Sequence, residues 1–194
     1  MSSSAEFFFR TEDLELDEIS DLFVETAQDR AVIDQLKNRN PTILVGSRGV
    51  GKSFLLRVAQ KEMMEEFENG KNFPVYLSFM RGSLLHSQDP EIFRAWMLGK
   101  ISSAIIKALR KAGKLAKVPS AASVISGGTL NVAVDKTEVE RFIDSAESAW
   151  KDSDTSVDSS KVPGIEDFKD ALEDLKDELG IRRFVLLIDE AAHI

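Results

Sequence analysis

Apolar residues follow two different periods along the chain. Spacing by three and four residues predicts amphipathic helices over residues 21–37, 54–67, 89–111, 137–150 and 165–179. Short continuous apolar runs predict strands over residues 42–45, 73–80 and 183–190, with a shorter candidate at 130–134. The run at 184–188 has no polar position, which indicates a strand buried on both faces, as in a parallel sheet between helix layers.

The order of these elements favours an α/β fold. A strand at 42–45, a helix at 54–67 and a strand at 73–80 form a βαβ unit, whose strands should lie parallel with a right-handed crossover. Residues 119–129 are small, polar and glycine-rich, and they predict a loop or linker. The Ser- and Asp-rich residues 151–161 predict a mobile segment.

The strand at 42–45 leads into a sequence that fits the Walker A phosphate loop, G-x-x-x-x-G-K-[ST]. Glycines let such a loop turn its backbone N–H groups inward, where they form a nest for phosphates. Lys52 then reaches the β- and γ-phosphates, and the Ser53 hydroxyl ligates Mg²⁺. The predicted nucleotide-binding residues of the loop are Gly46, Ser47, Arg48, Gly49, Val50, Gly51, Lys52, Ser53 and Phe54.

A glycine-rich turn that arises by chance is the alternative explanation for this loop. The strand before it, the helix after it and the match at every fixed position argue against chance. The N-terminus of the following helix also adds a partial positive charge beneath the phosphates. We therefore expect the loop to bind a nucleotide.

A second motif stands near the end of the chain, where the strand at 183–190 ends in Asp189 and Glu190. Ligands of open α/β sheets bind at the carboxyl ends of the strands. The pair fits a Walker B motif, in which Asp189 holds Mg²⁺ opposite Ser53 and Glu190 polarises the water that attacks the γ-phosphate. The alternative is a strand that merely ends in an acidic turn, but the complete loop upstream favours Walker B. The predicted catalytic residues are thus Glu190 and Lys52.

Together the two motifs resemble those of AAA+ ATPases, especially the origin-recognition branch and related bacterial ATP-binding proteins. The resemblance covers residues 20–80 and 182–194, and Arg48 stands where commoner AAA+ loops have proline. It implies a P-loop NTPase three-layer sandwich with a parallel sheet, and ATP and Mg²⁺ as cofactors. It also implies that Phe23 and Val24 lie near adenine, and that the protein works in a DNA-associated or defence-related complex.

Two features depart from the family pattern. Lys52 and Asp189 are 137 positions apart, farther than one strand-and-helix crossover requires, which predicts a helical insertion before the Walker B strand. The family's sensor strand, arginine finger and helical lid follow Walker B, whereas this sequence ends at Ile194. The sequence Asp-Glu-Ala-Ala-His is one residue longer than the helicase Asp-Glu-Ala-His box, so we interpret His193 as incidental.

These departures set the expected domain organisation. We expect an N-terminal segment over residues 1–20 and a partial P-loop ATPase domain over 21–194, incomplete at its C-terminus, with residues 118–162 flexible or inserted. Such a partial sheet leaves the strand at 184–188 with an open apolar edge, which invites aggregation. We therefore expect low solubility and negligible hydrolysis from these 194 residues alone.

The amino-acid composition excludes several further classes of protein. The chain has no cysteine and two histidines, which excludes a disulfide framework and disfavours a zinc site. No apolar run approaches the roughly 18 residues needed to span a bilayer, and no signal peptide is evident, so we expect a cytoplasmic protein without membrane contact.

The net charge of −8 argues against a surface that is basic all over and binds nucleic acid. The charges are, however, distributed unevenly along the chain. Residues 92–134 contain no acidic residue, and basic side chains recur between Lys100 and Lys117. A solvated helix face is one explanation, and a face that binds DNA or a protein partner is the other.

Two functions fit these observations. The first is an ATPase that couples Mg-dependent hydrolysis to a conformational change. The second is a nucleotide-gated switch or scaffold that binds ATP with little turnover, in an assembly formed by self-association or with other proteins. Glu190 favours hydrolysis because a pure binder does not require it.

Overall fold

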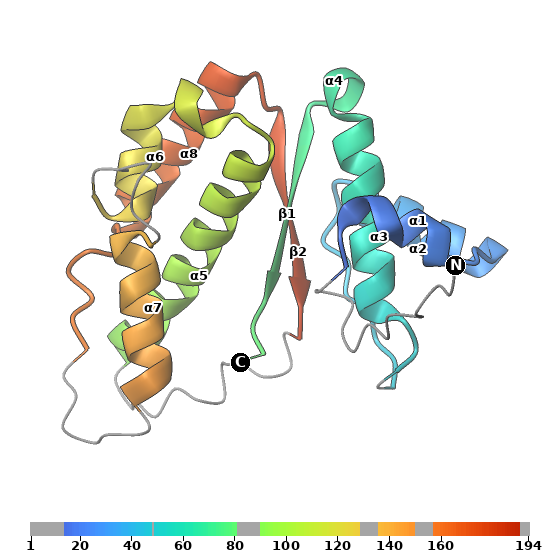
Figure 1. Cartoon of the computed structure of the whole chain (residues 1–194), viewed down its shortest axis with the longest axis horizontal. Coiled ribbons are helices and arrows are strands. Elements are labelled where there is room, and N and C mark those ends of the chain that lie inside the picture. Colours follow the sequence, from blue (N-terminus) through green and yellow to red (C-terminus); the bar gives the residue numbers. More distant parts are fainter. Residues whose placement is uncertain (1–13, 48, 81–89, 129–135, 150–156, 191–194) are drawn as a thin grey trace, which may run out of the picture.

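The computed structural model describes residues 14–47, 49–80, 90–128, 136–149 and 157–190. In this part of the chain, two parallel strands lie between two groups of helices (Figure 1). The elements are α1 (Leu16–Leu22), α2 (Ala27–Lys37), α3 (Lys52–Glu65), α4 (Phe67–Gly70), β1 (Asn72–Ser78), α5 (Pro90–Lys111), the short 3-10 helix η3 (Leu115–Lys117), α6 (Pro119–Ser126), α7 (Glu138–Ser148), α8 (Ile165–Leu179) and β2 (Arg183–Asp189).

The sheet joins two segments that lie far apart in the sequence. β1 and β2 pair in parallel, with Phe73 opposite Phe184 and Ser78 opposite Asp189. The strands expected at 73–80 and 183–190 are therefore confirmed to within two residues. Because the pairing is parallel, both strands end at the same edge, and this edge carries the carboxylates of the second motif.

The expected strand at 42–45 is wrong: residues 41–47 form no strand, and Ile43 and Val45 are 87% and 92% exposed. The expected pairing of this segment with 73–80 is also wrong, because β1 pairs with β2. A βαβ pattern predicts parallel strands in one sheet but does not say which strands are neighbours. Residues 42–45 would need a neighbouring strand to hydrogen-bond with their backbone N–H and C=O groups. Among the described residues, no such strand lies between them and β2.

The helix expected at 21–37 is observed only from Ala27, as α2; residues 21–22 are the end of α1, and residues 23–26 separate the two helices. The interruption comes from a capping box at Thr26, whose side chain accepts from the backbone N–H of Asp29 while the Asp29 carboxylate accepts from the Thr26 N–H. A helix that starts at Thr26 cannot continue the turn before it. α1 was missed by the helical spacing, and its Ile19 is fully buried against α3.

The remaining helix predictions agree with the structure. α5, α7 and α8 occupy the segments expected at 89–111, 137–150 and 165–179. α7 begins at a second capping box, in which Thr137 and Glu140 exchange hydrogen bonds. α8 ends at Gly180, whose φ of 63° gives the left-handed conformation that favours glycine.

The loop expected at 119–129 is instead a helix, α6, over most of its length. Ala121, Ala122 and Ile125 are buried against α5 and α8. The small side chains that indicated a loop allow close helix packing once a neighbouring face is available. α6 ends at Gly127, where a Cβ would lie 2.2 Å from the backbone oxygen of Lys161.

Some predictions fall outside the described residues, among them the strand at 130–134 and the first part of the mobile segment at 151–161. Residues 118–128 and 136–149, inside the region expected to be flexible or inserted, form helices with buried faces. Whether that region is an insertion, and where the domain boundaries lie, stay predictions.

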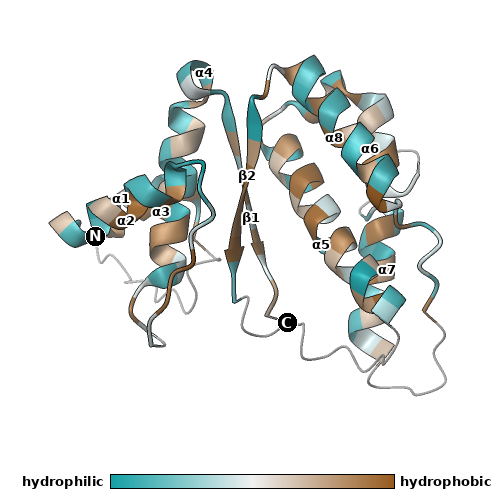
Figure 2. Ribbon diagram, turned by 180° about the vertical axis from the view of Figure 1, so that it is seen from behind, coloured by the Kyte–Doolittle hydropathy of each residue, from teal (hydrophilic) through white to brown (hydrophobic). Residues whose placement is uncertain are grey.

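The helices cover β1 better than β2. α3 packs on the face that carries Tyr76 and Leu187, while α5 packs on the opposite face of β1. The two strands are largely hydrophobic where they cross between the helix groups (Figure 2). On the α5 side, Leu186 and Ile188 of β2 nevertheless remain 39% and 38% exposed. The expectation that the strand at 184–188 is buried on both faces is therefore wrong, because no described helix covers Leu186 and Ile188 on the α5 side of β2.

The fold belongs to the α/β class, with helices on both sides of a small parallel sheet. Helices occupy the chain between β1 and β2, as expected for the segment before the Walker B strand. The complete P-loop sandwich stays an expectation.

Candidate nucleotide site

The glycine-rich loop has the backbone freedom that a phosphate nest requires. Gly49 and Gly51 have φ of +86° and +82°, which L side chains rarely adopt, and a Cβ at either position would meet nothing within 4 Å. Glycine is needed here for conformation and not for space. Gly51 is the last residue before α3, so the loop opens onto the N-terminus of a 14-residue helix.

Lys52 is the first residue of α3, and its side chain turns back over the loop. Its Nζ donates hydrogen bonds of 2.7 Å to the carbonyl oxygens of Gly46 and Ser47. The ammonium therefore lies against the loop, where a phosphate would add a stronger, charge-assisted partner. Ser53 follows at the second position of α3 and is half-buried.

Two aromatic rings meet beside the loop. Phe54 stacks on Phe23, with ring centroids 5.7 Å apart and an interplanar angle of 24°. The segment between α1 and α2 thus lies against the first turn of α3, as the adenine hypothesis requires. Val24 is 88% exposed, so it is accessible to a ligand, and its contact with adenine stays a prediction together with that of Phe23. Arg48 lies outside the described residues.

Asp189 and Glu190 stand at the carboxyl end of β2, at the same end of the sheet as the N-terminus of α3 (Figure 1). The Asp189 carboxylate accepts two hydrogen bonds, from the Tyr76 hydroxyl to Oδ2 at 2.7 Å and from the Glu190 N–H to Oδ1 at 2.9 Å. Asp189 is therefore held by both strands.

Glu190 has an unusual backbone, with a φ of 53°. This left-handed conformation costs a non-glycine residue about 1–2 kcal/mol. Its carboxylate accepts a long hydrogen bond, 3.4 Å, from the Ser78 hydroxyl at the end of β1. In this conformation Glu190 is turned toward β1.

Sequence reasoning missed Tyr76 and Ser78 as members of the site. They are two positions apart on β1, so they project from the same face of the strand. The strand prediction put them on one face, but only the register with β2 brings them next to Asp189 and Glu190.

The donors at the site match the chemistry of a Mg-nucleotide. Backbone N–H groups of a glycine-rich loop and the Lys52 ammonium suit phosphate oxygens. Mg²⁺ prefers one or two protein oxygens plus phosphates and water, and Ser53 and Asp189 are oxygen donors of this kind. No group of three or more His, Cys, Asp or Glu that could hold a metal without a nucleotide occurs among the described residues.

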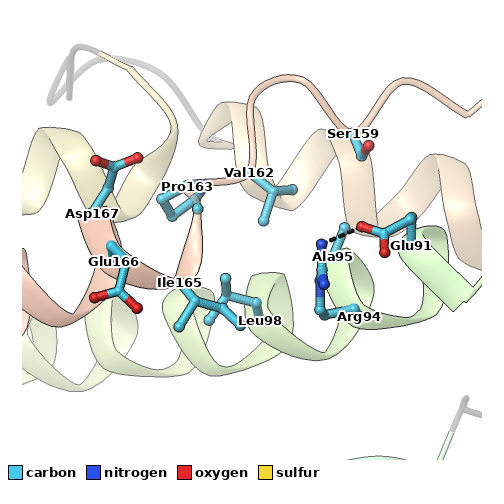
Figure 3. A pocket seen from close by; sticks show the side chains of 11 residues that line it. Glu91, Arg94, Ala95, Leu98, Ser159, Val162, Pro163, Ile165, Glu166 and Asp167 are labelled. Atoms are coloured by element: carbon cyan, nitrogen blue, oxygen red, sulfur yellow. Dashed lines mark hydrogen bonds and ion pairs between the residues drawn. The ribbon is translucent and has the colours of Figure 1, made fainter.

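Two clefts lie away from the loop. One, of about 440 Å³, is lined by the first turns of α5 and α8 and by the segment before α8, with Arg94 and Glu91 paired at its rim (Figure 3). The other, of about 620 Å³, runs along the outer edge of β1 between α3, α5 and α7. Neither is lined by a residue of the phosphate loop.

The basic residues of α5 serve largely as partners of other helices. Lys100 and Lys107 form ion pairs of 3.1 Å with Glu147 and Glu140 of α7, and Lys111 pairs with Glu15. Glu147 also accepts from the Trp96 indole N–H at 3.2 Å. These contacts give three basic side chains of the face between Lys100 and Lys117 partners within the chain, which neither the solvated-face nor the DNA-binding interpretation predicted. No ion pair involves Arg110, Lys114 or Lys117 among the described residues, although Lys114 lies over the Phe67 ring.

Among the described helices, none combines the length and the apolar character that crossing a membrane requires.

A family model matches the N-terminal part of the chain. Residues 7–88 match the model of a family described as ORC-CDC6-like. The matched segment contains the glycine-rich loop at residues 46–53 and ends before β2, so it does not reach the second motif. No curated protein and no solved structure matches the chain significantly. Over residues 7–88 the chain is thus similar, at the level of the family, to the ORC-CDC6-like proteins.

Proposed function

We propose that the chain binds Mg-ATP at the loop from Gly46 to Ser53 and hydrolyses it, coupling turnover to a conformational change. Lys52 contacts the β- and γ-phosphates, Ser53 and Asp189 hold Mg²⁺, and Glu190 polarises the attacking water. The observation that carries the proposal is the common placement of the N-terminus of α3 and the carboxyl end of β2 at one end of the sheet (Figure 1). The ORC-CDC6-like match over residues 7–88 adds support for an ATPase of a DNA-associated complex.

Each role follows from the chemistry of its side chain. A lysine ammonium is a point charge that attracts phosphate oxygens, and the helix N-terminus beneath the loop adds to the attraction. When bound, Mg²⁺ neutralises charge on the phosphates. Asp189 and Ser53 would hold it through their oxygen atoms, and Glu190 would accept a hydrogen bond from the attacking water.

Lys52→Ala tests nucleotide binding. Loss of a charge-assisted contact should cost about 1.5–3 kcal/mol, or about 10- to 150-fold in affinity for a fluorescent ATP analogue. Lys61→Ala, on the same helix but away from the loop, is the control and should bind as wild type does. Equal affinity of the Lys52 variant and wild type would refute the site.

A nucleotide-gated switch with little turnover is the second candidate, and the position of Glu190 favours it. Its carboxylate is bonded to Ser78, so it must be released before it can contact a water at the γ-phosphate. Glu190→Gln distinguishes the two functions. If the protein is an ATPase, Glu190→Gln binds ATP but loses the steady-state hydrolysis that wild type shows. If it is a switch, wild type and Glu190→Gln both bind ATP and hydrolyse it at the same slow rate. Asp189→Asn should instead weaken the Mg²⁺-dependent part of binding.

DNA is the proposed partner for the basic face only through Arg110, Lys114 and Lys117. Lys100 and Lys107 pair with α7, and Lys111 pairs with Glu15 just before α1. Self-association or a wider protein complex is proposed from the family resemblance.

A further inference from the structure

Tyr76 is the single tyrosine of the chain, and it contacts the second motif directly. We propose that Tyr76 is a positioning residue for Asp189: its hydroxyl holds the carboxylate in the orientation that Mg²⁺ requires. This inference rests on the proposed function, because it assumes that Asp189 faces the metal.

The contact crosses the sheet diagonally. Asp189 is opposite Ser78 in the register, and Tyr76 is two residues earlier on β1, so the tyrosine must reach along the strand. A long aromatic side chain can span this distance on one face of a sheet. The hydroxyl donates to Oδ2 at 2.7 Å, a short distance that is typical of a charge-assisted hydrogen bond.

The two donors to Asp189 fix the rotation of its carboxylate. Oδ2 accepts a hydrogen bond from the Tyr76 hydroxyl, and Oδ1 accepts one from the backbone N–H of Glu190. Each carboxylate oxygen can accept more than one hydrogen bond, so lone pairs remain for the water shell of a metal. Without the tyrosine hydroxyl, the Glu190 N–H would be the only remaining donor to this carboxylate among the residues that the structure describes. Partners of this kind around metal ligands orient them and tune their affinity.

Arg57 holds the tyrosine ring in turn. Its guanidinium carbon lies 5.2 Å from the ring centroid of Tyr76, and Arg57 as a whole residue is 8% exposed. Arg57 Nη2 donates to the carbonyl oxygen of Leu14 at 2.6 Å, and Nη1 donates to Gln60 at 2.7 Å. The ring is therefore fixed by α3, the helix that begins at the phosphate loop, and through Leu14 by the segment before α1.

A purely structural role is the competing explanation, in which the hydroxyl of a half-buried tyrosine simply finds an acceptor. The two explanations differ in one respect. A structural hydroxyl affects stability alone, whereas a positioning hydroxyl also changes the response of the site to Mg²⁺.

The contact itself can be tested without nucleotide. Incorporation of 3-fluorotyrosine labels one position, because the chain has one tyrosine, and gives one ¹⁹F resonance. We expect this resonance to move in Asp189→Asn and to stay in place in Asp174→Asn, an exposed aspartate on α8. A resonance that does not respond to Asp189→Asn would overturn the proposal.

The role is tested with Tyr76→Phe, which keeps the ring and removes the hydroxyl. We expect the Mg²⁺ concentration at half-maximal binding of a fluorescent ATP analogue to rise about 10-fold, with unchanged affinity in EDTA. Arg57→Met, which removes the cation over the ring, should shift the midpoint in the same direction, and Arg57→Lys should shift it less. Circular dichroism checks that each variant is folded.

The outcomes are distinct. An unchanged Mg²⁺ midpoint in Tyr76→Phe, or an equal loss of affinity with and without Mg²⁺, would show that the hydroxyl is only structural. Wild type that binds no nucleotide would refute the proposed function and, with it, the metal role of Tyr76. In that case the ¹⁹F result still establishes whether the contact with Asp189 exists.

Discussion

Glu62 of α3 joins two positive charges of α2 and offers a test of how this half of the fold is held. Arg30 donates to both carboxylate oxygens, at 2.7 and 2.9 Å, and Lys37 donates to Oε2 at 2.9 Å. The three side chains are 35%, 22% and 19% exposed for Arg30, Glu62 and Lys37. We expect Glu62→Gln to destabilise the protein, because it removes the negative charge that both cations share.

The expected magnitude lies between two limits. Charge-assisted hydrogen bonds contribute about 1.5–3 kcal/mol each when buried, and exposed ion pairs contribute about 0.2–1 kcal/mol. The partial exposure of the network and the amide oxygen that glutamine retains place the loss at about 1–2 kcal/mol. For a domain of this size, that loss lowers the melting temperature by about 2–8 °C.

The effect should depend on pH. Burial alone would raise the pKa of Glu62, but the hydrogen bonds and charges of Arg30 and Lys37 outweigh it and hold this pKa below its ordinary value. A carboxylate with a lowered pKa contributes stability that is fully present above the pKa of the unfolded chain, near 4.5, and is lost as the pH falls through the folded value. The difference between wild type and Glu62→Gln should therefore be largest at neutral pH and shrink below about pH 4.

Thermal melts over a pH series from 7 downward through 4.5 measure the effect. Glu173→Gln is the matched control, because Glu173 pairs with Lys176 on α8 but is 67% exposed, and its loss should cost less than about 0.5 kcal/mol. Nucleotide affinity should not change in Glu62→Gln, since the network lies toward the end of α3 remote from the loop. Equal melting of variant and wild type at pH 7, or a difference that does not shrink anywhere in the series below pH 4.5, would refute the reasoning.

Two further predictions concern α6 and the basic face. Gly127→Ala should destabilise the protein more than Gly113→Ala in urea denaturation. Both glycines have positive φ, so each substitution costs about 1–2 kcal/mol. Of the two, Gly127 alone also has a backbone oxygen 2.2 Å from the position of the new Cβ. Similar urea midpoints of the two variants would contradict the placement of α6. For the basic face, the double charge reversal Arg110→Glu with Lys117→Glu should weaken duplex DNA binding and flatten its salt dependence without unfolding the chain. If wild type shows no salt-dependent DNA binding, the interpretation of this face as a solvated surface holds instead.

Much of the local structure was accessible from the sequence because it depends on nearby residues. Periodicity located α5, α7 and α8, since an amphipathic stripe follows from spacing alone. The capping box at Thr26 was also present in the sequence, but apolar residues on both sides of it extended the predicted helix back to residue 21, across the true start of α2. α6 was misjudged because small residues are as compatible with a close-packed helix as with a loop.

For the candidate site, the sequence by itself determined the loop and the ends of its elements: glycines where φ is positive, Lys52 at the start of a helix, and Asp189 and Glu190 at the end of a strand. These are local properties of a short motif. The tertiary structure alone decided that β1 pairs with β2, that residues 42–45 form no strand, and that Tyr76 and Ser78 reach the two carboxylates. Strand pairing depends on which apolar faces the helices leave available, and the partners here are more than 100 residues apart, so no local pattern encodes the choice.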